Sequence, residues 1–144
     1  MIVYADASAL AKRYLAEAGS AEIETLVRQA DIVGTSVITR VEVSAAIAKA
    51  VRIGSLERTE AERILRAFRQ HWLELGALQV TEALVAEADT LAWEHGLRGY
   101  DAVHLASALV WQEAISEPVV LAAFDRQLWD AAQKVGLSAW PESL

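Results

Sequence analysis

The sequence predicts an α/β fold whose strands run parallel in one sheet. Strand-like and helix-like segments alternate along its 144 residues, as they do when parallel strands are joined by right-handed helical crossovers. Glycines fall between the segments, where turns and helix C-caps are expected. The length suits a single domain, residues 1–144, with room for a hydrophobic core.

Each strand is predicted from a short apolar run. The first run ends directly before Asp6, and the fourth ends shortly before Asp125. Such runs are typical of strands that are buried on both faces of a parallel sheet. The expected strands lie near residues 2–5, 32–35, 78–81, 118–123 and 137–140.

The helices are predicted from the longer segments between these runs. Residues 56–75 alternate charged and apolar side chains, which is typical of an amphipathic surface helix with a solvated face. Residues 101–109 form a more apolar helix that begins with Asp101. The expected helices lie near residues 7–17, 20–30, 38–53, 56–75, 82–95, 100–115 and 126–135.

Composition excludes several kinds of site. A chain without cysteine has neither disulfides nor thiolate metal ligands, which fits a reducing cytoplasm. No apolar run approaches the ~20 residues of a membrane span, and no basic segment precedes the first apolar residues, so neither a membrane anchor nor a secretory signal is expected. The net charge of −7 argues against broad electrostatic capture of nucleic acid, which would need local basic groups instead.

Four separated acidic residues are the candidate site. Asp6 and Asp125 follow predicted strands, and Glu42 and Asp101 lie near the starts of predicted helices. Because the carboxyl ends of parallel strands face one crevice, these side chains can converge there. Gathered carboxylates repel each other unless a proton or a cation intervenes. The sequence therefore predicts a site for Mg²⁺ or Mn²⁺, which prefer oxygen ligands.

Each acid also has a simpler explanation. Asp6 and Asp125 stand where helix N-caps are expected, and Thr39 with Glu42 matches the capping box. Asp101 suits the positive end of a helix dipole. The occurrence of all four in one α/β domain favours the metal site, although for Glu42 both interpretations remain open.

Neighbouring residues supply candidate supporting roles. Ser8 would hydrogen-bond Asp6. His104 lies three residues after Asp101, but within an apolar helix it is expected to be a hydrogen-bonded packing residue, and no zinc site is predicted. Four basic residues near the acids could bind phosphates: Lys12, Arg13, Arg98 and Arg126.

Four segments of the chain resemble the PIN domain, and more narrowly the VapC toxins of bacterial and archaeal toxin–antitoxin pairs. The likeness covers essentially the whole chain, in order. Single motifs are not specific, but the four together are. The segments are Tyr4–Leu10, Thr39–Val43, Arg98–Ala108 and Phe124–Leu128.

The resemblance implies a fold, a reaction and partners. The fold is a three-layer α/β/α arrangement with strand order 3-2-1-4-5, in which Asp6 and Asp125 meet. The reaction is metal-dependent RNA cleavage with Asp6, Glu42, Asp101 and Asp125 as the acidic quartet. The partners are a cognate antitoxin and a second copy of the chain. Many family members carry Ser or Thr two residues before the last Asp, whereas this chain has Ala123.

We therefore predict a Mg²⁺- or Mn²⁺-dependent endoribonuclease that a partner protein holds inactive. Asp6, Asp101 and Asp125 would bind metal, and Glu42 would bind metal, orient water, or both. One metal or two is left open. Two alternatives are a catalytically silent interaction module with the same fold, and a phosphoryl-transfer domain with Asp6 as its nucleophile. The second alternative expects another acid where Ser8 stands.

Two surfaces are predicted for the partners. An antitoxin segment would lie in a groove between the first helices and helix 38–53, over Ala45, Ala46, Ile47, Ala48 and Val51. A symmetric homodimer is expected because the first two helices carry many apolar residues, namely Leu10, Tyr14, Leu15, Ile23, Leu26 and Val27.

Overall fold

The structure, a computed structural model, describes residues 1–144 and contains one five-stranded parallel sheet. Its strand order is β3-β2-β1-β4-β5, as the sequence resemblance implied. The α/β class and the topology are therefore confirmed. The strands are β1 (Ile2–Ala5), β2 (Ile32–Ser36), β3 (Gly76–Leu78), β4 (Val119–Ala122) and β5 (Ser138–Trp140).

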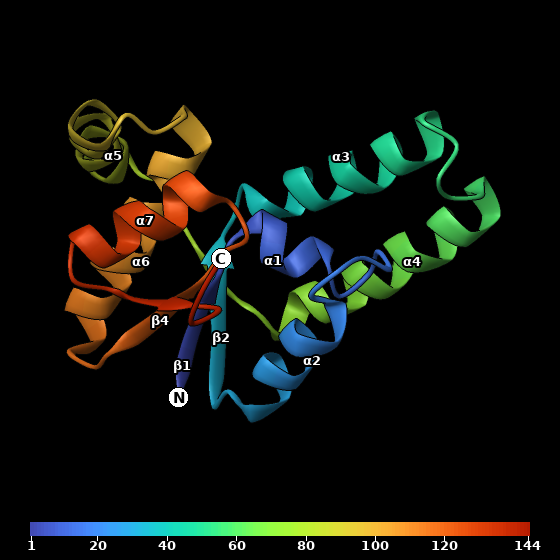
Figure 1. Ribbon diagram of the computed structural model, residues 1–144, viewed down its shortest axis with the longest axis horizontal. Coiled ribbons are helices and arrows are strands. Elements are labelled where there is room, and N and C mark those ends of the chain that lie inside the picture. The colour runs from blue at the N-terminus through green and yellow to red at the C-terminus, as the bar shows by residue number, and fades with distance from the viewer.

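Seven α-helices and one 3₁₀ turn connect the strands. Figure 1 shows α1 to α4 on one side of the sheet and α5 to α7 on the other, which gives the expected three layers. They are α1 (Ala7–Ala11), α2 (Ser20–Gln29), α3 (Thr39–Arg52), α4 (Arg58–His71), η1 (Trp72–Glu74), α5 (Glu82–His95), α6 (Gly99–Ile115) and α7 (Arg126–Lys134).

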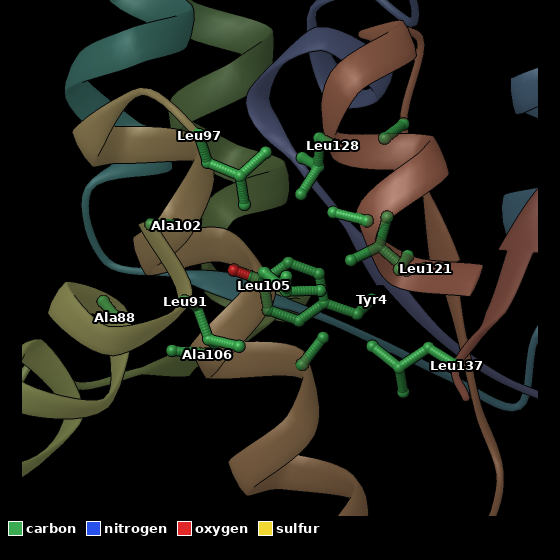
Figure 2. Packing of buried hydrophobic residues seen from close by; sticks show 14 of the residues in the cluster. Tyr4, Ala88, Leu91, Leu97, Ala102, Leu105, Ala106, Leu121, Leu128 and Leu137 are labelled. Atoms are coloured by element: carbon green, nitrogen blue, oxygen red, sulfur yellow. The ribbon is translucent and has the colours of Figure 1, made fainter. Parts of the chain in front are cut away.

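The two faces of the sheet bury two separate cores. Successive residues of β1 alternate between them, because side chains along a strand point to opposite faces. Tyr4 packs with the core under α5, α6 and α7, whereas Val3 and Ala5 pack with the core under α1 to α4. Figure 2 shows Tyr4 among Leu105 of α6 and Leu121 of β4. The short apolar runs of the sequence are thus explained by burial on both faces.

The pairing of β1 with β4 determines where the candidate site lies. Ala5 is in register with Ala122, and the Asp6 N–H donates to the Ala122 carbonyl at 3.0 Å. Asp6 and Asp125 therefore leave neighbouring strands at the same edge of the sheet. No helix of the structure combines the length and the hydrophobicity of a membrane span.

The first predicted helix is too long. α1 ends at Ala11 rather than near residue 17. The chain then turns back, and the Lys12 ammonium donates to the Ala18 carbonyl at 2.8 Å. Gly19 adopts a φ of 92°, and a Cβ at this position would lie 2.7 Å from the Phe124 ring. The apolar pattern after Ala11 therefore reflects packing of a turn rather than a continued helix.

The third strand and the fourth helix also differ in their boundaries. β3 covers Gly76–Leu78 rather than 78–81, because Thr81 instead caps α5 by accepting a hydrogen bond from the Leu84 N–H at 3.1 Å. The segment 56–75 is divided into α4 and the 3₁₀ turn η1. α4 buries Ala61, Ile64 and Phe68 and exposes its charged face, as the amphipathic pattern predicted.

The apolar residues that motivated the homodimer are used within the monomer. Leu10, Ile23 and Leu26 are buried, and Tyr14, Leu15 and Val27 pack against the same core. Their presence on the first two helices is therefore no argument for a second copy. Dimerisation itself stays a prediction.

Candidate active site

The four acids predicted from the sequence line one pocket. It has a volume of about 280 Å³ and lies beyond the carboxyl ends of β1 and β4. The N-terminal ends of α1, α3, α6 and α7 surround it, so each acid comes from a different helix start. The lining residues are Asp6, Ala7, Ser8, Glu42, Arg98, Asp101, His104, Phe124 and Asp125.

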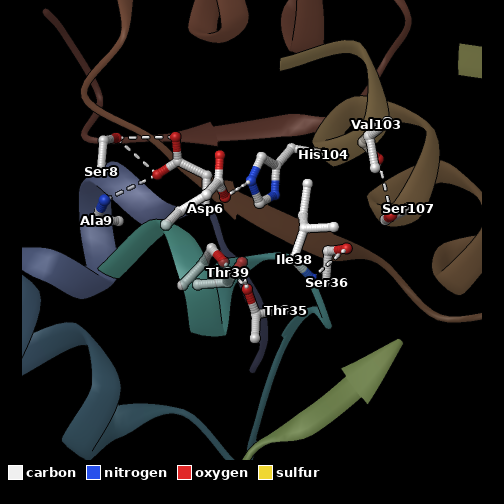
Figure 3. Close-up of polar contacts among 12 residues, drawn as sticks. Asp6, Ser8, Ala9, Thr35, Ser36, Ile38, Thr39, Val103, His104 and Ser107 are labelled. Carbon is white, nitrogen blue, oxygen red and sulfur yellow. Dashed lines mark hydrogen bonds and ion pairs between the residues drawn. The ribbon is translucent and has the colours of Figure 1, made fainter. Parts of the chain in front are cut away.

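Asp6 is the most buried of the acids, with only 3% of its surface exposed. Its Oδ1 accepts a hydrogen bond from the Ala9 N–H at 2.8 Å and so caps α1. The Ser8 hydroxyl also donates to the Asp6 carboxylate, at 2.7 Å to Oδ1 and 2.9 Å to Oδ2 (Figure 3). Burial raises the pKa of Asp6 to about 6, although His104, Ser8 and the Ala9 N–H act in the opposite direction.

Ser8 also joins the two strand ends that carry Asp6 and Asp125. Its Oγ accepts a hydrogen bond from the Phe124 N–H at 3.0 Å while its hydroxyl donates to Asp6. Ala123 is completely buried, and its N–H donates to the Trp140 carbonyl at 3.1 Å. Ala123 thus supplies no hydroxyl, and Ser8 is the side chain that binds the chain next to Asp125.

Asp125 divides its two oxygens between two partners. Oδ1 accepts from the Leu128 N–H at 3.1 Å and caps α7. Oδ2 accepts from the Arg98 Nη2 at 2.7 Å. For Asp6 and Asp125, the N-cap interpretation and a place in the pocket are therefore both correct, because one oxygen suffices for a cap.

Glu42 does not form the capping box that its spacing with Thr39 suggested. α3 has no side-chain N-cap, and the Thr39 hydroxyl instead pairs with that of Thr35 at 2.7 Å. Glu42 reaches across to α6, where its Oε2 lies 2.7 Å from the His104 Nε2. The capping interpretation is therefore wrong for Glu42, and its carboxylate belongs to the pocket.

His104 is the hydrogen-bonded packing residue that the sequence predicted. It is 1% exposed, and its Nδ1 lies 2.8 Å from the Tyr4 hydroxyl. A carboxylate can only accept hydrogen bonds, so Nε2 carries a proton toward Glu42, and in the neutral imidazole Nδ1 accepts from Tyr4. Burial raises the pKa of Tyr4 and keeps that hydroxyl protonated. The result is a buried chain from Tyr4 through His104 to Glu42.

Sequence reasoning missed the role of Tyr4. The residues of this chain are separated by 100 and 62 positions, so only the fold brings them together. A tyrosine inside an otherwise aliphatic strand was the only available signal, because a buried phenol needs a polar partner.

Asp101 occupies the first turn of α6 and pairs with Arg98. The Arg98 Nε donates to the Asp101 Oδ2 at 2.9 Å, while its Nη2 donates to Asp125. The hydrogen bond with Asp101 and the charges of both acids raise the pKa of Arg98. One guanidinium therefore bridges two of the four carboxylates.

The other three predicted phosphate-binding residues lie in different surroundings. Lys12 pairs with Glu17 at 3.3 Å and stacks over the Phe124 ring, and Arg13 pairs with Glu24 at 3.0 Å. Both side chains are mostly buried. Arg126 is exposed and 4.0 Å from Asp130. Of the four, only Arg98 contacts the acids.

The donor set of the pocket fits a hard divalent cation. Four carboxylates supply oxygen atoms, the ligands that Mg²⁺ and Mn²⁺ prefer, and the pocket contains neither thiolate nor methionine sulfur. In this arrangement no three His, Asp or Glu side chains are close enough together to hold a metal ion. The acids would therefore have to move closer together around a cation.

Comparisons with known proteins agree with this fold. The PIN domain model matches residues 3–134. Ribonuclease VapC45 of Mycobacterium tuberculosis (strain CDC 1551 / Oshkosh) is 36% identical over 144 residues, which covers 99% of this chain and 97% of that protein.

Solved structures share the fold at lower identity. PAE2754 from Pyrobaculum aerophilum is 22% identical, with a TM-score of 0.65 over 96% of this chain and 83% of that one. A toxin–antitoxin complex from Klebsiella pneumoniae is 14% identical, with a TM-score of 0.57 over 82% of this chain and 83% of that one. From the match of the family model to most of the sequence and the identity to VapC45, we conclude that the chain belongs to the PIN domain family.

Proposed function

We propose that this chain is a divalent-metal-dependent endoribonuclease and the toxin of a VapBC-type toxin–antitoxin pair. The single observation that carries the proposal is the gathering of Asp6, Glu42, Asp101 and Asp125 in one pocket at the carboxyl edge of a parallel sheet. The relative with 36% identity is named a ribonuclease. Residues 1–144 would act as a single nuclease domain.

The roles of the acids follow from their surroundings. Asp6, Asp101 and Asp125 would hold Mg²⁺ or Mn²⁺, and Glu42 would bind the cation or orient the attacking water. A bound cation would lower the pKa of a water molecule and stabilise charge that develops on the phosphodiester. Ser8 fixes both oxygens of Asp6, and His104 fixes Glu42, so these two carboxylates are held in place before substrate arrives.

RNA is a polyanion, so an acidic protein would repel it as it approaches the pocket. Its phosphates would need local cations, because the net charge is −7. Arg98 stands at the pocket with 70% of its side chain exposed and is the best placed of the predicted phosphate-binding residues. Lys12, Arg13 and Arg126 lie farther from the acids or in ion pairs of their own.

An antitoxin would cover a hollow between α3 and α4. This hollow has a volume of about 350 Å³ and is lined mainly by apolar side chains, including Ile47, Ala48 and Val51. These three residues belong to the predicted groove, but their partner surface is α4 rather than the first helices. A protein of the same fold has been solved as a toxin–antitoxin complex. An amphipathic helix suits such a surface.

The experiment is a cleavage assay on single-stranded RNA with four variants. Asp6→Asn, Glu42→Gln, Asp101→Asn and Asp125→Asn are each expected to lower the cleavage rate by more than about 100-fold while circular dichroism shows a retained fold. EDTA should abolish cleavage by the wild type, and Mg²⁺ or Mn²⁺ should restore it.

A matched control is Asp130→Asn, which makes the same change on α7 at an exposed ion pair outside the pocket. It should cleave like the wild type. Cleavage that persists after thorough chelation would exclude the metal mechanism, and wild-type rates in any two of the four variants would exclude the quartet. Absence of cleavage by the wild type on all RNAs would favour the catalytically silent interaction module.

A further inference from the structure

The four carboxylates of the pocket are satisfied in two different ways. The inner pair, Asp6 and Glu42, receives hydrogen bonds from Ser8, the Ala9 N–H and His104, all of which are held within the fold. The outer pair, Asp101 and Asp125, is bridged by the single guanidinium of Arg98. The pocket therefore already contains one cation of its own.

Arg98 is held by these two ion pairs and by little else. Its side chain is 70% exposed, whereas the side chains of Asp101 and Asp125 are 13% and 27% exposed. Its backbone carbonyl accepts the Ala102 N–H at 3.0 Å at the start of α6, which any residue could do. The guanidinium can therefore leave the acids without disturbing the packing.

We propose that Arg98 is a built-in counter-ion that a divalent cation must displace from Asp101 and Asp125, and that the displaced guanidinium then pairs with an RNA phosphate. This inference rests on the proposed function. A cation and the guanidinium would compete for the same Oδ2 atoms of both acids, which Arg98 holds at 2.9 and 2.7 Å. The divalent cation and the guanidinium would also repel each other, because both are positively charged and both would lie against the same two carboxylates.

Displacement would leave Arg98 in a useful place. It stands at the open side of the pocket, next to the carboxylates that would carry the cation. A guanidinium binds phosphate through two parallel hydrogen bonds, and it remains charged at every working pH. Arg98 would thus oppose cation binding and favour RNA binding, and these two opposite effects distinguish it from a purely structural residue.

The first test measures Mn²⁺ binding by isothermal titration calorimetry without RNA. Arg98→Gln should bind Mn²⁺ about tenfold more tightly than the wild type, because two exposed ion pairs no longer compete. Arg98→Lys, which keeps the charge but not the two-pronged contact, should fall between them. Arg126→Gln is the matched control, since it removes the same charge from an exposed arginine that does not touch the pocket. It should change the affinity less than about twofold.

The second test follows the Arg98 Nε–H resonance by NMR. In EDTA this proton should be protected from exchange by Asp101, and Mg²⁺ should remove that protection while the Arg126 resonance stays unchanged. The third test measures the affinity of a single-stranded RNA at saturating Mg²⁺, with Glu42→Gln present in every protein so that the RNA is not cleaved. Arg98→Gln should bind it about tenfold more weakly, because one charge-assisted phosphate contact is lost.

The outcomes separate this inference from the proposed function. Absence of Mn²⁺ binding in both the wild type and Arg98→Gln overturns both. Mn²⁺ binding that is equal in wild type and Arg98→Gln, or an equal gain in Arg98→Gln and Arg126→Gln, overturns the counter-ion role alone. Tighter Mn²⁺ binding together with unchanged RNA affinity overturns the phosphate role and leaves the counter-ion role supported.

Discussion

At the scale of single residues, the site uses side chains that perform two tasks. Asp6 and Asp125 each give Oδ1 to a helix cap and direct the carboxylate into the pocket. The cap fixes the orientation of the carboxylate, because the helix amide that donates to it belongs to a packed element. This explains why the sequence alone could not choose between a cap and a site residue for either aspartate.

Burial of Asp6 predicts a pH-dependent effect of its replacement. Its pKa is raised from 3.8 to about 6 in the folded protein. The folded protein therefore binds this proton more tightly than the unfolded chain, and stability falls as pH rises from about 4 to about 6 and is constant above. The fall attributable to Asp6 is at most about 3 kcal/mol.

Asp6→Asn mimics the protonated side chain. In EDTA it should raise the free energy of unfolding by about 1–3 kcal/mol at pH 7.5 and change it little at pH 4.5, where Asp6 is already protonated. Urea unfolding at both pH values measures the difference. The exposed Asp89→Asn on α5 is the control and should have no effect at either pH. An equal increase in the free energy of unfolding at both pH values would contradict a raised pKa of Asp6.

The buried chain from Tyr4 through His104 to Glu42 predicts unequal effects for two similar substitutions. Tyr4→Phe removes the hydroxyl from a completely buried imidazole nitrogen, so it should lower the free energy of unfolding by about 1–3 kcal/mol. Tyr14→Phe removes a hydroxyl at 3.0 Å from the Nδ1 of His71, which is only partly buried. Water can replace that contact, so its effect should stay below about 1 kcal/mol.

Urea denaturation followed by circular dichroism compares the two variants directly. The ring is retained in both, so lost packing does not differ between them. Equal losses would mean that the Tyr4 hydroxyl contributes no more than a surface hydrogen bond. The Nε2–H tautomer of the imidazole, read from ¹⁵N chemical shifts, should persist in Tyr4→Phe because the Glu42 carboxylate still accepts from Nε2.

At the scale of elements, apolar runs located the strands and most helices, because local pattern reports burial directly. The pattern predicted the wrong boundaries where apolar residues belong to a turn rather than to a helix or a strand. Tyr14 and Leu15 pack against the core without continuing α1, and Val80 packs beside the sheet without joining β3. Pairing and turn geometry, which depend on residues distant in sequence, decide these boundaries.

The glycine at position 34 of β2 leaves room for a side chain of the helix that packs on the sheet. A Cβ at this position in β2 would lie 2.6 Å from two ring carbons of Trp111 on α6. Gly34→Ala should therefore lower the free energy of unfolding by about 1–3 kcal/mol, because the indole must move within a packed layer. At its neighbour in the sheet, Gly76, a Cβ would make ordinary van der Waals contact, with the nearest atom at 3.7 Å. Gly76→Ala should change stability by less than about 1 kcal/mol.

The double variant Gly34→Ala with Trp111→Leu tests the cause. Each change alone should destabilise the protein, but the smaller leucine makes room for the new methyl group, so the combined loss should be less than the sum. Thermal unfolding of the four proteins provides the cycle. Additive losses would show that the alanine acts through the strand and not through Trp111.

At the scale of the whole molecule, the two proposed sites occupy different places, although α3 contributes to both. The carboxyl edge of the sheet carries the acidic pocket, while the hollow between α3 and α4 lies on the side of the molecule that holds α1 to α4 (Figure 1). The sequence predicted an apolar partner surface on helix 38–53, and Ile47, Ala48 and Val51 do line this hollow. It could not predict that α4 forms the other wall, because nothing local in the sequence relates residues 47 and 61.

This separation predicts a variant that loses its antitoxin but retains its nuclease activity. Ala48 is an exposed small residue in the hollow, and Ala48→Trp should fill part of the 350 Å³ that an amphipathic helix would occupy. Arg52, Arg58 and Glu62 also line the hollow, and Glu62 pairs with Arg58 at 3.4 Å, so Arg52 is the charge that would favour an acidic residue beside the apolar face of the incoming segment. Antitoxin affinity should fall more than about tenfold, since a filled pocket removes the anchor of the interface.

The measurement pairs antitoxin titration with RNA cleavage for the same protein. Ala48→Trp should cleave RNA at the wild-type rate, because the acids are held by Ser8, His104 and Arg98 and not by the wall of the hollow. Ala86→Trp, the same substitution at an exposed site on α5, should leave both readings unchanged. If Ala48→Trp binds the antitoxin as tightly as wild type, the partner does not use the hollow. If its cleavage falls as well, the hollow and the pocket are not independent.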